Sequence, residues 1–329
     1  MSVLRIWLNY LLTSAAGQLN PLVNFNTYAV LLAVLGVLLI LMPRGLGNKF
    51  IGCGGLLIAF ILPLKQPPEL QMLVFDVGQG TAILLRTPNH QFLYDTGPQY
   101  TENFDAGSAL VSPYLHSQGL AGLDAVIVSH NDMDHSGGLQ GILTEIKVDN
   151  LWLGEPEKFE RSQNSPVVMA CHDTQPWRWD NVDFRFITWP ISSSDKANNR
   201  SCVLLVSYKD HKILVTGDIE KEVERRLVAE QQLTPVEVLL APHHGSNTSS
   251  TSGFIAQTAP EYVIYSSGYR NQHGHPHKDV KTRYKIANVT QLNTALNGAI
   301  EFEWHKNEVR SLKLFRQSAR RYWFDDKAE

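Results

Sequence analysis

The hydrophobic pattern separates an apolar beginning from a longer region in which short apolar runs end in polar corners. An uncharged apolar run covers residues 28–42, and a shorter, glycine-rich run covers residues 50–64. Beyond them, apolar stretches of strand length recur between segments with helical spacing. We therefore predict a membrane segment over residues 1–65 with about two transmembrane helices, followed by a globular domain over residues 66–329.

The globular part alternates predicted strands with predicted helices, which indicates an α/β fold. Residues 219–228 show helical spacing with acidic residues first and basic residues later, as the helix dipole favours. The expected helices lie near residues 107–118, 138–145, 220–231 and 278–287. The expected strands are 71–77, 81–86, 91–95, 125–129, 150–153, 202–208, 212–216, 237–241 and 262–266. We expect two β-layers covered by helices, with the polar loops at one edge.

The first apolar run reaches roughly a membrane-spanning length when it is extended back to Val23. The second run is near the lower limit, and its glycines suit packing against another membrane helix. The connector carries Arg44 and Lys49, so the positive-inside rule places it in the cytoplasm. We expect a multi-pass protein of the cytoplasmic (inner) membrane, with the globular domain on the outer, periplasmic face. Residues 4–12 form another apolar patch, which either lies in the interface or is the tail of a truncated helix.

Composition leaves the class of partner open. The net charge is −3, which does not favour nucleic acid by itself. A C-terminal segment interleaves basic and aromatic residues, and it either contacts phosphates or forms a solvated strand face with aromatic core residues. This segment contains Arg310, Lys313, Phe315, Arg316, Arg320, Arg321, Tyr322 and Trp323. The three cysteines permit a disulfide between Cys171 and Cys202 without requiring one.

The strongest chemical signal is the run His130-Asn131-Asp132-Met133-Asp134-His135. Four of its six residues can hold a divalent metal, and the run follows an apolar strand and precedes two glycines. Ligands crowded into one loop at a strand end can converge on neighbouring metal positions. Histidine and carboxylate without thiolate suit zinc or manganese, and they suit hydrolysis.

Other strand ends supply further polar groups in order. Each is an apolar run followed by a polar corner that bears glycine, at residues 76–80, 95–97, 216–218, 243–246 and 274–277. Polar loops on a rigid sheet edge are the usual setting of an active site. We therefore expect these corners to meet the His130 loop.

The order of these motifs resembles the metallo-β-lactamase superfamily, and their details resemble the C-terminal domain of the ComEC family of DNA-uptake proteins. The likeness covers roughly residues 68–329 and implies an α/β fold, a metallo-β-lactamase-like αββα sandwich preceded by transmembrane helices. It rests on Asp-Val-Gly-Gln-Gly at Asp76, His-x-Asp-x-Asp-His at His130, Asn199-Arg200-Ser201, Thr-Gly-Asp at Asp218, His-His-Gly-Ser at His243, Gly-His-Pro at His275 and Arg320-Arg321-Tyr322-Trp323.

The chain departs from the wider superfamily in its ligand set. Asp132 stands where the usual His-x-His-x-Asp-His pattern has its second histidine. The histidine expected upstream of Asp218 is absent, and Asn199 and Ser201 occupy that region. The added carboxylate moves the preference from zinc toward manganese or magnesium. The incomplete zinc ligand set also argues against a β-lactamase.

The resemblance implies two divalent metal ions, Mn²⁺ or Zn²⁺. We assign His130 and Asp132 to one metal, Asp134 and His135 to the other, and Asp218 as the bridge. Two metals a few ångströms apart would lower the pKa of a bound water toward neutrality and prepare it for attack on phosphorus.

One of His243 or His244 would complete the second metal site; sequence order favours His243 but does not exclude His244. Asp134 and His275 are the predicted catalytic residues. His275 either contacts the scissile phosphate and assists the leaving oxygen, or it is a structural histidine beside Pro276.

The remaining polar residues receive supporting or substrate roles. Asp76 and Asp95 are expected to fix loops by accepting backbone N–H bonds rather than to bind metal. Asn199 and Ser201 either support the site through hydrogen bonds or contact substrate. The predicted substrate-binding residues are Asn199, Ser201, Ser246 and Asn271.

The resulting hypothesis is a membrane-tethered, metal-dependent DNA phosphodiesterase that degrades the non-imported strand in natural transformation. A complete ComEC-like protein would also carry a channel domain, so this chain looks like the C-terminal piece. Expected partners are DNA, the membrane and other DNA-uptake components, including a channel-forming polypeptide. One alternative is a membrane-anchored hydrolase of small phosphodiesters or phosphocholine groups. Another is a non-catalytic DNA-binding competence component, against which the ligand set argues.

Overall fold

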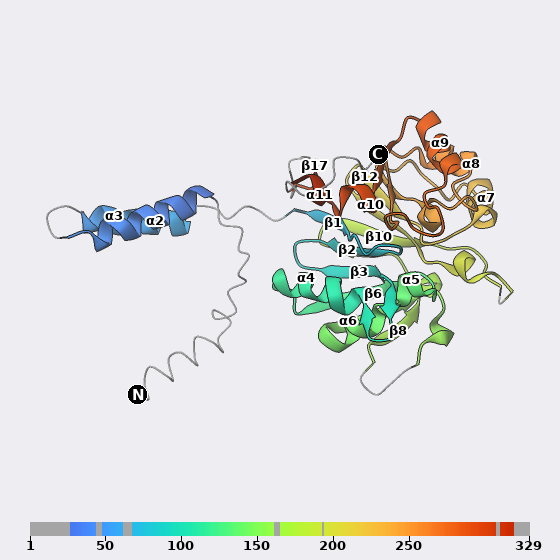
Figure 1. Ribbon diagram of the computed structural model, residues 1–329, viewed down its shortest axis with the longest axis horizontal. Helices are drawn as coiled ribbons and strands as arrows, with labels where there is room; N and C mark the ends of the chain where they lie inside the picture. The colour runs from blue at the N-terminus through green and yellow to red at the C-terminus, as the bar shows by residue number, and fades with distance from the viewer. Residues whose placement is uncertain are drawn as a thin grey trace. The chain divides into compact units, whose positions relative to one another are not determined.

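The computed structural model describes residues 27–43, 48–61, 68–160, 165–192, 194–306 and 310–318. The chain divides into two compact units (Figure 1). One comprises Met1–Pro67 with Leu115–Leu120, and the other comprises Pro68–Tyr114 with Ala121–Glu329.

The first unit contains two apolar helices, α2 (Thr27–Leu41) and α3 (Lys49–Ile61). Glycines allow the two backbones to approach closely, because a Cβ atom at Gly36 would lie 2.8 Å from the carbonyl oxygen of Gly52. This is the kind of small-residue packing expected of the glycine-rich run.

None of the helices in the described residues combines the length and the apolar character that a membrane crossing requires. The predicted transmembrane spans therefore stay a prediction. Residues 4–12, Val23 and Arg44, on which part of that prediction rests, lie outside the described residues.

The second unit contains an eight-stranded sheet in the order β17-β16-β1-β2-β3-β6-β7-β8. Strands β3, β6, β7 and β8 run parallel to one another, and the other neighbours pair antiparallel. The strands are β1 (Leu70–Val74), β2 (Ala82–Arg86), β3 (Gln91–Thr96), β6 (Gly122–Val128), β7 (Lys147–Leu153), β8 (Val167–Ala170), β16 (Ile300–Trp304) and β17 (Arg310–Leu314).

A seven-stranded sheet follows the order β15-β14-β13-β12-β11-β10-β9, and its strands β12 to β15 are parallel. Its strands are β9 (Trp177–Trp179), β10 (Val182–Ile187), β11 (Val203–Tyr208), β12 (His211–Val215), β13 (Val238–Leu240), β14 (Tyr262–Tyr265) and β15 (Thr290–Asn293). A separate hairpin joins β4 (Gln99–Thr101) to β5 (Phe104–Asp105).

Helices cover the outer faces of both sheets (Figure 1). Helices α5 (Met133–Ser136) and α6 (Leu139–Glu145) contact β3, and α6 also contacts β7. The second sheet is covered by α7 (Lys221–Ala229), α8 (Ser252–Thr258) and α9 (Lys278–Ile286). The remaining helical segments are η1 (Gly107–Val111), α4 (Ser112–Ser117), η2 (Pro156–Lys158), η3 (Cys171–Asp173), η4 (Ala197–Arg200), η5 (Pro242–Gly245), α10 (Thr294–Asn297) and α11 (Phe315–Ser318).

Two apolar cores follow from the alternation of side chains along the strands. In β11, Leu204 and Val206 enter the core between the two sheets. Their neighbours Val203 and Leu205 enter the core between the second sheet and its helices. A strand buried on both faces needs a continuous apolar sequence, which β11 has. The predicted αββα sandwich is confirmed.

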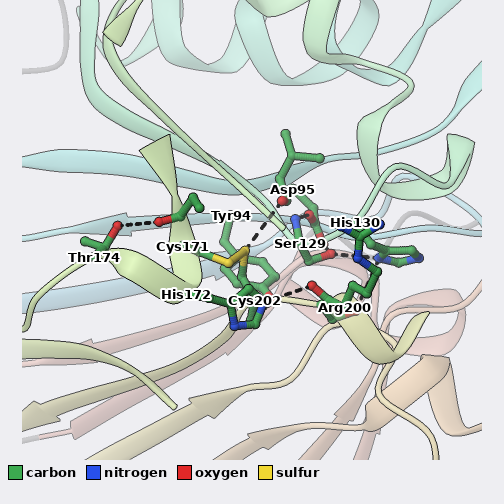
Figure 2. The surroundings of a disulfide bond; sticks show 12 residues. Tyr94, Asp95, Ser129, His130, Cys171, His172, Thr174, Arg200 and Cys202 are labelled. Atoms are coloured by element: carbon green, nitrogen blue, oxygen red, sulfur yellow. Dashed lines mark hydrogen bonds between the residues drawn. A yellow bond between two sulfur atoms is a disulfide. The ribbon is translucent and has the colours of Figure 1, made fainter. Parts of the chain in front are cut away.

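A disulfide links the two sheets beside the end of β6 (Figure 2). Cys171 begins η3, directly after β8, and Cys202 directly precedes β11. Both cysteines are buried, and the backbone N–H of Cys202 donates to the carbonyl oxygen of Ser129 at 3.0 Å. The disulfide that the sequence permits is therefore formed, and it fixes the segment that leads into β11 next to the His130 loop.

Removing this disulfide by the double substitution Cys171→Ala and Cys202→Ala should lower the free energy of unfolding by roughly 3–4 kcal/mol, the value expected for a loop of this length. The two cysteines are 31 residues apart. Chemical denaturation of the full chain, followed by tryptophan fluorescence without reductant, measures the change. Cys53→Ala is the matched control because Cys53 is a free, exposed cysteine. An unchanged denaturation midpoint in the double variant would contradict the prediction.

Candidate metal centre

The candidate ligands lie in loops that follow the carboxyl ends of strands. His130 to His135 follow β6, Asp218 follows β12, and His243 and His244 lie in η5 after β13. Strands β3 and β6 are parallel neighbours, as are β12 and β13, so each pair of loops leaves its sheet at one edge. The two sheets thereby bring their loops together, as the sequence motifs predict.

Two groups of metal-ligating atoms form there among the described residues, and His135 belongs to both. The first group contains His130, His135 and Asp218, and the second contains Asp134, His135 and His244. Within each group, the ligand atoms all lie within 4.8 Å of one another.

The shortest contacts in these groups join histidine nitrogens to carboxylates and to each other. The Nε2 atom of His135 is 3.1 Å from Asp218 Oδ1 and 3.1 Å from His244 Nε2. The Nε2 atom of His244 is 3.1 Å from Asp134 Oδ2 and 3.5 Å from Asp218 Oδ2. Asp132 borders the first group, 3.4 Å from His130 Nε2, with 52% of its side chain exposed.

The geometry favours His244, and not His243, as the histidine of the second group. His244 is almost fully buried between Asp134 and His135. His243 lies farther out, with Nε2 3.7 Å from Asp218 Oδ2 and Nδ1 3.1 Å from Thr248 Oγ1. Sequence order favours His243, whereas the structure brings His244 closer to the other donors; which of the two histidines holds a metal stays a prediction.

A buried carboxylate orients the shared histidine. Asp95 Oδ2 lies 2.6 Å from His135 Nδ1, and both side chains are fully buried. The other oxygen of Asp95 accepts the backbone N–H of Ser129 at 2.7 Å, as predicted for a loop-fixing aspartate. An Nδ1 proton held by Asp95 leaves the Nε2 lone pair of His135 free for a metal.

The charges of the cluster depend on one another. Burial opposes the protonated form of His135, yet the carboxylates of Asp218 and Asp95 outweigh it and raise the pKa of the ring well above its usual value. Burial favours neutral Asp218, but His135 and His244 hold the pKa of this carboxyl well below its usual value. Burial likewise opposes ionised Asp134, but the hydrogen bond with His244 and the positive charges of His135 and His244 together outweigh it, so the pKa of Asp134 is lowered. The carboxylates are ionised and require nearby positive charge.

A divalent metal pair fits these residues. Among the described residues, the buried His130 Nε2 has no hydrogen-bond partner, while its Nδ1 lies 3.0 Å from Ser129 Oγ. Three imidazole Nε2 atoms and the Asp134 and Asp218 carboxylates thus face one another, and no thiolate is among them. Nitrogen and oxygen donors of this kind hold zinc or manganese.

His275 lies beside the centre. Its ring centroid is 5.7 Å from that of His243 and 6.3 Å from that of His244. Burial and the neighbouring His244 and His243 lower the pKa of His275 to about 4. The ring is therefore neutral near pH 7, and its buried Nδ1 has no hydrogen-bond partner within the described residues.

Two of the predicted substrate-binding residues make hydrogen bonds that support the centre. Ser201 is fully buried, accepts the backbone N–H of Asp218 at 3.0 Å and lies 3.4 Å from His130 Nδ1. Asn199 is buried, and its Oδ1 accepts the backbone N–H of Glu220 at 2.9 Å. For both residues the geometry favours support through hydrogen bonds, one of the two roles left open by the sequence.

The other two predicted substrate-binding residues also have partners within the protein. Ser246 is buried and lies 3.1 Å from Thr248 Oγ1. The Nδ2 atom of Asn271 donates to the carbonyl oxygens of Gly268 and His275, and its Oδ1 accepts the backbone N–H of His275 at 2.9 Å. Contact of these two side chains with substrate stays a prediction.

Two arginines of the basic C-terminal segment form ion pairs within the protein. Arg310 pairs with Glu261 and Glu237, and Arg316 Nη2 lies 2.8 Å from Asp76 Oδ2. Asp76 therefore bonds to a side chain as well as to its own loop. Residues Arg320 to Trp323 lie outside the described residues.

Sequence reasoning missed a buried carboxylate that supports the ligand loop. Glu155 Oε2 accepts the backbone N–H of Asn131 at 3.1 Å, and its Oε1 lies 2.9 Å from Arg200 Nη1. The missed signal is Glu155 itself, an acidic residue that follows the apolar end of β7 after one glycine. Ser129, which bonds to Asp95 Oδ2 at 2.9 Å, was also missed, although it directly precedes His130.

Comparison with known sequences assigns the family. A sequence profile described as the Metallo-beta-lactamase superfamily matches residues 75–268, which include the ligand loop, Asp218 and both η5 histidines. The chain belongs to this superfamily.

Its curated relatives include competence proteins. Competence protein ComA of Neisseria gonorrhoeae is 35% identical over 290 residues, 87% of this chain and 40% of that protein. Recombination protein 2 of Haemophilus influenzae is 31% identical over 259 residues, 78% of this chain and 32% of that protein. ComE operon protein 3 of Bacillus subtilis is 26% identical over 343 residues, 94% of this chain and 44% of that protein. The likeness to ComEC-type competence proteins is confirmed, and the chain spans less than half the length of these relatives.

Asp95→Asn should weaken metal binding by about 10- to 100-fold, because a neutral amide no longer fixes the tautomer of His135. Isothermal titration calorimetry of the metal-stripped protein with Mn²⁺ measures the affinity. Asp124→Asn is the matched control, since Asp124 lies 3.0 Å from His90 in a similar pair outside the centre. Equal affinities of the two variants would show that Asp95 does not act through the metal ligand.

Proposed function

We propose that this chain is a metal-dependent phosphodiesterase that hydrolyses DNA during DNA uptake. The observation that carries the proposal is the pair of overlapping donor groups that share His135. Two neighbouring divalent ions stabilise the attacking and leaving oxygens of a displacement at phosphorus. The name of the Neisseria gonorrhoeae relative, a competence protein, supports DNA as the substrate.

Each residue has a defined task in this proposal. His130 and Asp132 would hold one ion, and Asp134, His135 and His244 the other, with Asp218 placed between them. Asp95 keeps the proton on Nδ1 of His135, so the ring presents Nε2.

His275 would assist the leaving oxygen. Its pKa near 4 keeps the ring neutral near pH 7, so one ring nitrogen carries a proton and the other can accept one. Its position beside His243 and His244 supports this role, because a leaving oxygen would have to lie close to the donor groups.

We further propose that the hydrolase domain is tethered to the cytoplasmic membrane, faces outward and degrades the strand that is not imported. Large apolar side chains of α2 and α3 are exposed, including Leu31 at 60% and Phe50 at 90%, which suits a lipid or helix partner. The buried disulfide supports an outward-facing domain, because disulfides persist in oxidising compartments. A channel-forming polypeptide is the proposed partner.

Asp132→Ala and Asp218→Ala should each abolish metal-dependent hydrolysis of linear DNA while leaving the fold intact, because no neighbouring carboxylate replaces either ligand. The assay uses the purified full chain on DNA and on a chromogenic small diester, with circular dichroism as the check on folding. Asp149→Ala is the control, since Asp149 is an exposed carboxylate paired with Lys147. Wild-type rates in both ligand variants would refute the two-metal proposal. Hydrolysis of the small diester without hydrolysis of DNA would show that the small diester, and not DNA, is the substrate.

Manganese should support faster turnover than zinc in metal-stripped protein. The reason is that Asp132 makes the first donor group richer in oxygen, and hard oxygen ligands suit manganese better than zinc. Turnover at saturating concentrations of each metal is the right measure, since zinc can still bind more tightly. Faster turnover with zinc would show that Asp132 does not set the metal preference.

A further inference from the structure

The loop from Gly268 to His277 carries a row of aromatic rings that leads away from the donor groups. His244, nearly buried, lies 6.3 Å from His275 between ring centroids. His273 stacks on His275 with centroids 5.7 Å apart and an interplanar angle of 14°. His273 is exposed to solvent, so the row runs from the centre to the surface.

A second exposed ring begins the same loop. Tyr269 is 59% exposed, and the guanidinium of Arg270 lies over its ring at 5.2 Å from the centroid. More than half of this large aromatic side chain is open to solvent, and the arginine beside it adds positive charge. Stacked rings with adjacent arginine are the groups by which proteins hold single-stranded nucleic acid.

The loop is held in place rather than hanging free. At one end, a Cβ atom at Gly268 would lie 2.9 Å from the backbone nitrogen of Gln79. At the other end, the backbone N–H of His277 donates to the carbonyl oxygen of Gly245 at 2.9 Å. Asn271 bonds across the middle to Gly268 and His275. A braced loop presents its rings with little loss of conformational entropy on binding.

We propose that Tyr269 and His273 are a stacking surface for unpaired bases of a nucleic-acid strand whose scissile phosphate lies at the donor groups. The inference rests on the proposed function and names its substrate class more closely: a single strand, or the unpaired end of a duplex. Inside a duplex the faces of a base are covered by its neighbours, so only unpaired bases can stack on these rings.

Binding of a labelled single-stranded oligonucleotide to the full chain, measured by fluorescence anisotropy, tests the inference. Tyr269→Ala and His273→Ala should each weaken binding by roughly 10-fold, within the range for the loss of one base–aromatic stack. Tyr269→Phe and His273→Phe keep a ring and should bind like wild type. His116→Ala is the control for loss of an exposed histidine, since His116 is exposed on α4.

A second probe separates stacking from contact with phosphates. An abasic strand of the same length has the same phosphates but no bases, so the two alanine variants and wild type should bind it equally. Equal weakening on both strands would overturn the inference, as would alanine variants that bind the normal strand like wild type. Single-strand binding without hydrolysis would leave the stacking surface in place and refute the proposed function. Hydrolysis of DNA by a protein whose alanine variants bind like wild type would refute the stacking surface and leave the proposed function in place.

Discussion

The contact between Asp95 and His135 is the constraint on which the site depends. Both side chains are fully buried and lie 2.6 Å apart. Because His135 belongs to both donor groups, the orientation of one imidazole sets the geometry of both. Asp95 ends β3 and also accepts the backbone N–H of Ser129 at the end of β6, so a single carboxylate fixes two neighbouring parallel strands and the ring between them.

Burying this much charge is possible only because each carboxylate has a partner. Asp218 is buried, and its pKa stays low because positive charge on His135 and His244 offsets the cost of its burial. Hydroxyl groups supply further hydrogen bonds at the centre: Ser129 bonds to Asp95, and Ser201 bonds to the backbone of Asp218. Ser201, which lies in the region where the superfamily pattern has a further histidine, thus has a structural task there.

The sequence predicts strands that carry a long apolar run, and it misses several strands that are short or have an interrupted pattern. All nine predicted strands are present; in β11, for example, Val203 and Leu204 face different cores, so the run is apolar on both faces. In β10 (Val182–Ile187), charged residues alternate with apolar ones, and β9 is a short edge strand, so neither forms an apolar run. The ligand loop was predictable since its donors are adjacent in sequence. The choice between His243 and His244 was not predictable from the sequence. Both residues have a left-handed backbone, and the geometry of this turn decides which imidazole lies against Asp134 and His135.

Each donor group borders on a partly exposed aspartate of the ligand loop, although most of its members are buried. The group of Asp134, His135 and His244 is closed by two buried rings. Its carboxylate, Asp134, is one-third exposed, and Asp132, which borders the group of His130, His135 and Asp218, is half exposed. Catalytic metal sites differ from structural ones in keeping a position open to solvent. The two aspartates of the ligand loop are where this otherwise buried centre meets solvent, and one of them stands where the usual pattern has a histidine.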